Sequence, residues 1–145
     1  MIPRDHSVSA LLVGDYQQDR DLLHRIFGHA GWRLFEARGR CRAMRCLEQH
    51  HVQVVIAEAS VPNWSWKTLL HDLHGLERPP QLVVTSPQAD DYLWSEALNL
   101  GAYDVLSRPF DRDEVERVVA SAGRHFDFEP MPPGRLLPLS AAGAA

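Results

Sequence analysis

The pattern of apolar and polar positions divides the chain into two kinds of segment that alternate. Five short, mostly apolar runs have the composition of buried strands. Each is followed by a segment whose apolar residues recur every three or four positions, as in a helix with one buried face. The strand-like runs cover residues 9–15, 32–37, 52–59, 81–86 and 103–109, and the helical segments cover residues 19–31, 41–50, 65–76, 90–102 and 111–126. The pattern predicts five strands and five helices in strict alternation.

Whereas residues 32–37 alternate between polar and apolar positions, most of the strand-like runs are apolar almost throughout. Such strands have both faces buried, which is typical of a parallel sheet covered by helices on each side. Right-handed crossovers then wind the chain into a three-layer α/β sandwich. We therefore expect a doubly wound (βα)5 domain over residues 9–126, with any site at the carboxyl ends of its strands.

Signals for helix ends support this division. Gly31 and Gly101 stand at the ends of the first and fourth helical segments, where a glycine often ends a helix. In the fourth segment the spacing places Leu93, Ala97 and Leu100 on the buried side.

The composition changes after residue 126. Residues 127–145 contain four prolines and four alanines and have no regular period, so we expect a flexible Pro/Ala-rich tail or the start of a linker. The N-terminal apolar run is too short for a signal peptide, and no run of about 18 apolar residues could span a membrane. We therefore expect a cytoplasmic protein that does not engage a membrane.

The net charge of −4 argues against a dedicated nucleic-acid binder. The one basic cluster, RGRCRAMR at residues 38–45, is interpreted as a solvated helix face. Cys41 and Cys46 are five residues apart and point to different sides of a helix. We therefore expect buried free thiols rather than a disulfide or a zinc site.

Polar residues stand where the predicted strands end. The first strand ends in Gly14-Asp15, the third in Glu58, the fourth in Thr85-Ser86 and the fifth in Ser107-Arg108-Pro109. The carboxyl ends of parallel strands meet at one edge of a sheet, so these groups should share one shallow crevice.

In these strand-end residues the sequence resembles the receiver domains of two-component response regulators. The resemblance covers about residues 9–126 and rests on the motifs LLVGD, VVIAEASVP, LVVTS and GAYDVLSRPF. It implies a flavodoxin-like fold with strand order 2-1-3-4-5. In the family, the first motif ends in two acidic residues that bind Mg²⁺, and the second carries the aspartate that accepts phosphate. The third carries a Thr or Ser that contacts the phosphoryl group, and the fourth carries a Lys before Pro-Phe.

The chain departs from this family pattern at the positions that carry the chemistry. Losing a carboxylate at the first acidic position and lengthening the acceptor from Asp to Glu should weaken Mg²⁺ binding, so no cofactor is expected. The departures are Gly14 at the first acidic position, Glu58 at the acceptor position, Arg108 at the lysine position and Val105 where an aromatic switch residue is common; Asp15, Thr85 and Pro109 match the pattern.

Arg108 suggests a fixed charge pair in place of a phosphate site. Its guanidinium can hold a carboxylate through two parallel hydrogen bonds, so we expect it to grip Glu58, with Thr85 adding a further bond. Two alternatives stay open: Glu58 faces solvent, or it accepts phosphate.

The sequence therefore predicts a phosphorylation-independent protein-interaction module of a two-component pathway. The resemblance implies a histidine kinase or a downstream effector as partner, docking on a face that includes Trp94, Tyr103 and Val105. A homodimer stays open. The alternatives are a conventional phosphoacceptor switch with an unusual acceptor and, from another class, a small enzyme using Asp15 and Glu58 as an acid–base pair.

Two further clusters lie outside these motifs. Trp64 and Trp66 flank Ser65 beside the predicted crevice, and we expect them either to cover it or to anchor a partner. His71 and His74 are one helical turn apart but lack an evident third ligand, so no metal site is expected.

Overall fold

The computed structural model describes residues 7–59, 64–87 and 90–128. The strands are β1 (Ser9–Val13), β2 (Arg33–Ala37), β3 (Val54–Glu58), β4 (Gln81–Ser86) and β5 (Asp104–Ser107). The helices are α1 (Arg20–Ala30), α2 (Arg40–Gln49), α3 (Trp66–His74), α4 (Asp91–Leu100) and α5 (Arg112–Phe128). The expected alternation of five strands and five helices is confirmed.

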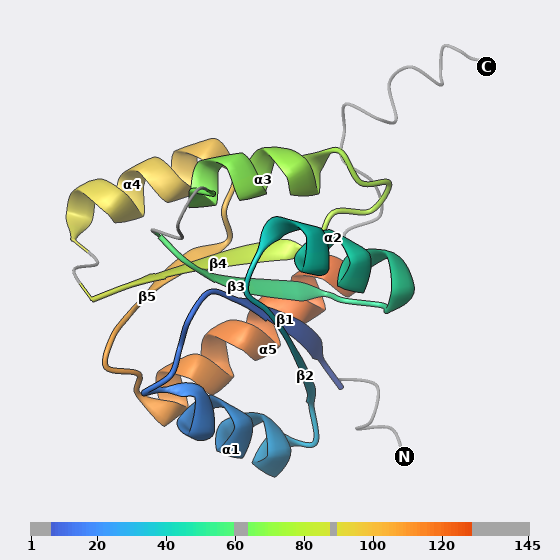
Figure 1. The fold of residues 1–145 in the computed structure, drawn as a ribbon. Helices are drawn as coiled ribbons and strands as arrows, with labels where there is room; N and C mark the ends of the chain where they lie inside the picture. Colours follow the sequence, from blue (N-terminus) through green and yellow to red (C-terminus); the bar gives the residue numbers. More distant parts are fainter. Residues whose placement is uncertain (1–6, 60–63, 88–89, 129–145) are drawn as a thin grey trace.

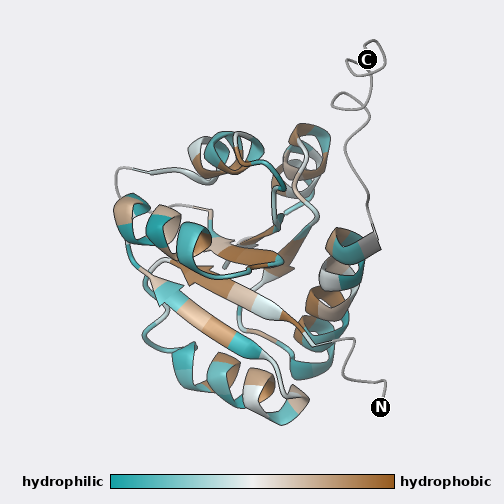
Figure 2. Ribbon diagram, turned by 90° about the vertical axis from the view of Figure 1, so that its right-hand side faces the viewer, coloured by the Kyte–Doolittle hydropathy of each residue, from teal (hydrophilic) through white to brown (hydrophobic). Residues whose placement is uncertain are grey.

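The strands form one parallel sheet in the order β2-β1-β3-β4-β5, as expected. Figure 1 shows α2, α3 and α4 on one face of the sheet and α1 and α5 on the other. Each strand alternates its side chains between these faces. In β3, for example, Val55 and Ala57 join the core under α2, α3 and α4, whereas Val54 and Ile56 join the core under α1 and α5. The strands are accordingly apolar along most of their length (Figure 2).

The end of the domain differs slightly from the sequence prediction. Helix α5 continues to Phe128, two residues beyond the expected boundary. The rest of the predicted tail, residues 129–145, lies outside the described residues. No helix in the described part of the chain is long and apolar enough to cross a membrane.

The two glycine helix ends are present as predicted. Gly31 and Gly101 follow α1 and α4 with φ of 76° and 113°, the left-handed conformation that favours glycine. However, Leu100 is 48% exposed, so the prediction that it points inward is wrong. It is the last residue of α4, whereas Ala97, one turn earlier, is fully buried.

The prediction for Trp64 and Trp66 is also wrong. Both are core residues, 6% and 5% exposed, in the hydrophobic cluster under α2, α3 and α4. The indole N–H of Trp64 donates to Asp72 Oδ2 at 3.2 Å, and Asp72 also accepts from Arg40 Nε at 2.8 Å. The loop before α3 thus delivers two large side chains into the core rather than over the crevice.

The two cysteines are free, as expected, but only partly buried. Cys46 is half-buried and Cys41 is exposed, so the prediction of buried thiols is wrong for Cys41. Cys41 lies on the outer side of α2, whereas Ala43 on the opposite side packs into the core.

We predict that Trp66→Ala destabilises the domain by about 3–5 kcal/mol, because it removes a large buried side chain and leaves a cavity. Urea unfolding measures the free-energy change. Trp94→Ala is the matched control, since Trp94 is 50% exposed. Its cost should stay below about 1 kcal/mol. Equal costs for the two variants would contradict the placement of Trp66 in the core.

Candidate functional site

The carboxyl ends of the strands gather the predicted site residues at one edge of the sheet. Glu58 at the end of β3 lies opposite Thr85 in β4, and Val13 of β1 lies opposite Ala57. Gly14 therefore adjoins Glu58 on the other side. Arg108 follows β5 directly, and its backbone N–H donates to Ser86 O at 3.1 Å. The parallel register thus places these positions side by side.

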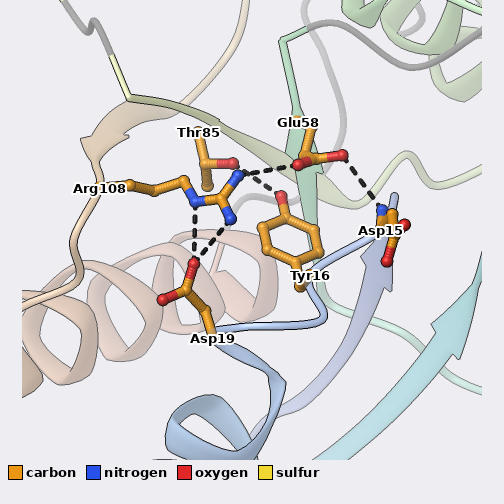
Figure 3. A network of polar contacts seen from close by, with 6 residues as sticks. All are labelled: Asp15, Tyr16, Asp19, Glu58, Thr85 and Arg108. Atoms are coloured by element: carbon orange, nitrogen blue, oxygen red, sulfur yellow. Dashed lines mark hydrogen bonds and ion pairs between the residues drawn. The ribbon is translucent and has the colours of Figure 1, made fainter.

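Arg108 lies between two carboxylates (Figure 3). Its Nη1 donates to Glu58 Oε2 at 2.8 Å, which is the expected ion pair. Its Nε and Nη2 both donate to Asp19 Oδ2, at 2.9 and 2.7 Å. The two-pronged contact is therefore made with Asp19 and not, as predicted, with Glu58. All three side chains are only 18–19% exposed, so Glu58 does not face open solvent.

These contacts keep the guanidinium charged. Burial alone would lower the pKa of Arg108, but hydrogen bonds and attraction from Asp19 and then Glu58 outweigh it and raise that pKa. A cation removed from water requires such partners, because an unpaired charge at a partly buried site is strongly destabilising. The site thus holds one fixed positive charge between two negative ones.

Both oxygens of the Glu58 carboxylate have partners. Oε2 accepts from Arg108, and Oε1 accepts from the backbone N–H of Asp15 at 3.1 Å. Asp15 thus contacts Glu58 through its main chain, and Asp15 itself is exposed to solvent. Glu58 thus links the ends of β1, β3 and β5.

Thr85 makes a different hydrogen bond from the one predicted. It is 1% exposed, and its hydroxyl lies 2.7 Å from the hydroxyl of Tyr16, not against Glu58. Burial raises the pKa of Tyr16 well above its usual range, so the phenol stays protonated and able to share this bond. The ring of Tyr16 also lies 5.2 Å from the Arg108 guanidinium carbon, within range of a cation–π contact.

Tyr16 and Asp19 were missed by the sequence reasoning. Both lie in the segment between β1 and α1; the hydrophobic pattern leaves Tyr16 between the predicted elements and places Asp19 at the start of the first helical segment. Asp19 offered a signal: it occupies the N-cap position of α1, where a carboxylate commonly accepts a backbone hydrogen bond. Here it makes no such side-chain bond, and its carboxylate turns to Arg108 instead.

Gly14 and Glu58 fit together sterically. A Cβ atom built on Gly14 would lie 2.7 Å from Glu58 Oε1 and 3.0 Å from its Cγ. Gly14 also has φ of 130°, a conformation that side-chain-bearing residues rarely adopt. The longer acidic side chain thus occupies the space that a residue with a side chain at position 14 would need.

The residues present do not fit a Mg²⁺ ion. Such an ion needs several oxygen ligands in near-octahedral positions. Position 14 supplies no carboxylate, and both Glu58 oxygens are already hydrogen-bonded. Across the described ranges, no group of three or more His, Cys, Asp or Glu side chains is placed to hold a metal.

The three residues of the predicted partner face differ in exposure. Trp94 on α4 is half-exposed. Tyr103 is partly buried, and its hydroxyl hydrogen-bonds to Ser121 Oγ. Val105 is only 9% exposed and packs in the core, so its expected place on the docking face is wrong. The aromatic groups that this face offers to solvent lie on α4.

Fold and strand-end site together define a receiver-type domain. Residues 10–120 match the response regulator receiver domain family, and the chain belongs to that family. The match runs from Ala10 in β1 to Ala120 in the middle of α5.

Curated relatives differ in how much of their length the chain matches. It is 22% identical to sporulation initiation phosphotransferase F of Bacillus subtilis, over 75% of this chain and 88% of that protein. It is 26% identical to the regulatory protein AtoC of Escherichia coli, over 77% of this chain but only 24% of that protein. The chain therefore spans nearly all of the first relative and about a quarter of the second.

Solved structures show the same fold. The signal receiver domain of an HD domain-containing protein from Pseudomonas fluorescens has a TM-score of 0.73 and 25% identity, covering 83% of this chain and 98% of that one. A receiver domain from Saccharomyces cerevisiae, crystallised with a histidine phosphotransfer signalling protein, has a TM-score of 0.72 and 14% identity, covering 82% and 90%.

We predict that Gly14→Ala destabilises the domain by about 1–3 kcal/mol, because the new methyl group meets Glu58 and forces an unfavourable backbone conformation. In a Glu58→Ala background the steric part should disappear and the cost should fall. Gly28→Ala is the control, because a Cβ there meets nothing within 4 Å and α1 should gain slightly. Urea unfolding of the four variants measures the coupling. Additive effects of Gly14→Ala and Glu58→Ala would contradict the steric fit.

We predict unequal costs for the two ends of the Glu58–Arg108 pair. Glu58→Gln leaves Arg108 with Asp19 and should cost below about 1 kcal/mol, whereas Arg108→Met leaves two neighbouring carboxylates without their cation and should cost about 1–3 kcal/mol. The double variant should cost less than the sum. A double-mutant cycle by urea unfolding near neutral pH gives the coupling energy. A coupling of zero would show that the pair contributes nothing in solution.

Proposed function

We propose that this receiver domain is a protein-interaction module that works without accepting phosphate on Glu58. The observation that carries the proposal is the internal pairing of Glu58 at the acceptor position: Arg108 holds one carboxylate oxygen and the Asp15 backbone holds the other. The pocket is thus filled by groups of the chain itself.

Phosphoryl transfer to this position would meet three obstacles. The reaction depends almost entirely on positioning and on stabilising the transferred charge. Here the acceptor oxygen would have to leave Arg108, the attacking geometry would shift by one methylene, and the metal that the family uses would lack a ligand at Gly14. A misplacement of about 1 Å alone costs on the order of a hundredfold in rate.

The Tyr16–Thr85 bond supports a fixed state of the site. In the family that the chain belongs to, the hydroxyl at the Thr85 position contacts the phosphoryl group. In this chain that hydroxyl is buried and paired with Tyr16. A rearrangement driven by phosphate would have to break this bond and move a ring that lies against Arg108.

The expected partner is a protein of a signalling pathway. One structural neighbour was crystallised with a histidine phosphotransfer protein, and several curated relatives are transcriptional regulators. A histidine kinase, a phosphotransfer protein or a downstream effector is therefore the class of partner that we propose. Tyr92 and Trp94 on α4, 74% and 50% exposed, are apolar groups available for such a contact.

An enzyme that uses Asp15 and Glu58 as an acid–base pair is not supported. Glu58 is held between a guanidinium and a backbone N–H, and Asp15 meets it through main-chain atoms. This arrangement leaves neither oxygen of Glu58 free to take a proton from a substrate.

We predict no phosphoryl mass increment after the full chain is incubated with acetyl phosphate and Mg²⁺ and read by intact-mass spectrometry. A receiver domain with aspartate at the acceptor position, treated in parallel, shows that the reagent is active. The Glu58→Gln variant distinguishes the site from other nucleophiles. A mass increment on the natural sequence that Glu58→Gln abolishes would establish the alternative, a live phosphoacceptor switch.

A further inference from the structure

Charge is segregated along the sheet. Residues 20–50, which form α1, β2 and α2, carry seven arginines and three carboxylates. Residues 51–128 carry six basic and twelve acidic side chains. The sheet order places β2 at one edge and β5 at the other, so a mildly acidic protein has a basic edge. The overall charge of −4 conceals this difference.

Three arginines at the basic edge form a group that we call the α2 strip: Arg38, Arg42 and Arg45. Arg42 and Arg45 are three residues apart within α2 and lie on the same side of the helix, whereas Arg38 lies two residues before α2, beyond Gly39, whose backbone is extended. All three are exposed, and within the described residues none has an ion-pair partner. Their neighbour Arg40 points the other way and binds Asp72 of α3.

The α2 strip opposes the stability of its own helix. The N-terminal end of a helix attracts negative charge and the C-terminal end attracts positive charge. Helix α2 has arginines and no acidic residue in its first turn, no basic residue in its last turn, and Gly39 without a side-chain cap at its start. Arg42 and Arg45 also repel each other. A helix face that contacts only solvent gains nothing from this unfavourable placement of charge. Departures from the usual rules of helix capping and charge placement occur most often at functional sites.

We propose that the α2 strip binds an acidic helical segment of a partner protein, with two carboxylates three residues apart. Guanidinium groups pair with carboxylates through two hydrogen bonds, and equal spacing on both helices lets Arg42 and Arg45 form two pairs together, while Arg38 adds positive charge before the start of α2. A long nucleic acid fits less well, because the acidic remainder of the domain would repel it. This inference goes beyond the proposed function, since it holds whether or not Glu58 accepts phosphate.

The test uses two synthetic helical peptides of identical composition. One carries Glu at positions i and i+3, and the other has the same two glutamates on opposite sides of the helix. Each is titrated at low salt into the isotopically labelled full chain, and amide shifts are followed by NMR. We expect saturable shifts centred on residues 38–45 with the aligned peptide, weaker binding of the scrambled one, and loss of binding as salt rises.

Two double variants remove the same number of positive charges and so distinguish an effect of the α2 strip from an effect of net charge. Arg42→Gln with Arg45→Gln should weaken binding of the aligned peptide by about tenfold. Arg117→Gln with Arg124→Gln, both exposed on α5, should leave it nearly unchanged. The strip variant should also be as stable as the natural chain or slightly more so, which a purely structural role for these arginines does not predict.

Four results would overturn the proposal. They are no saturable shifts with the aligned peptide, shifts centred away from residues 38–45, equal weakening by the two double variants, and tighter binding of a short single- or double-stranded oligonucleotide than of the peptide. The last result would assign the strip to nucleic acid instead.

Discussion

The architecture of the site depends on one partly buried cation. Arg108 stands at the end of β5 with 19% of its side chain exposed, and a charge so placed needs partners that replace water. Glu58 supplies one from β3, and Asp19 supplies the other from the start of α1. The guanidinium therefore ties the ends of two strands to the segment that begins the first helix. Tyr16 is held in the same segment, under the cation and against Thr85, which extends the network from charge to a buried hydroxyl pair.

Gly14 and Glu58 depend on each other sterically. The distance from a Cβ at position 14 to Glu58 Oε1 would be 2.7 Å, so a side chain at position 14 would require the Glu58 carboxylate to shift. Replacing Gly14 alone therefore creates a close contact, and shortening the residue at position 58 alone leaves a gap. The site is consistent in its present form, as a sequence that specifies one structure should be.

The fold and the strand-end residues could be predicted because they follow from periodicity and from the parallel sheet itself. Once five buried strands are identified, Glu58, Thr85 and Arg108 must lie at one edge. Tyr16 and Asp19 could not be predicted in this way, because their positions depend on how the segment before α1 folds over that edge. Trp64 and Trp66 were misassigned for a related reason: sequence places them beside the crevice, but only the packing of α3 shows that they point into the core. Leu100 fits the helical period yet is exposed at the last residue of α4.

The two charged regions of the domain follow opposite rules. At the strand ends, every charge of the Arg108 network is matched inside the chain, so a ligand would have to displace a partner before it gained a contact. On α2 and just before it, three guanidinium groups have no ion-pair partner in the described part of the chain, so a carboxylate from outside would gain contacts without displacing any. Binding energy is therefore easier to obtain at the basic edge than at the site that the family uses for phosphate. In a receiver domain with a filled acceptor pocket, such a fixed surface offers recognition that requires no prior chemical change.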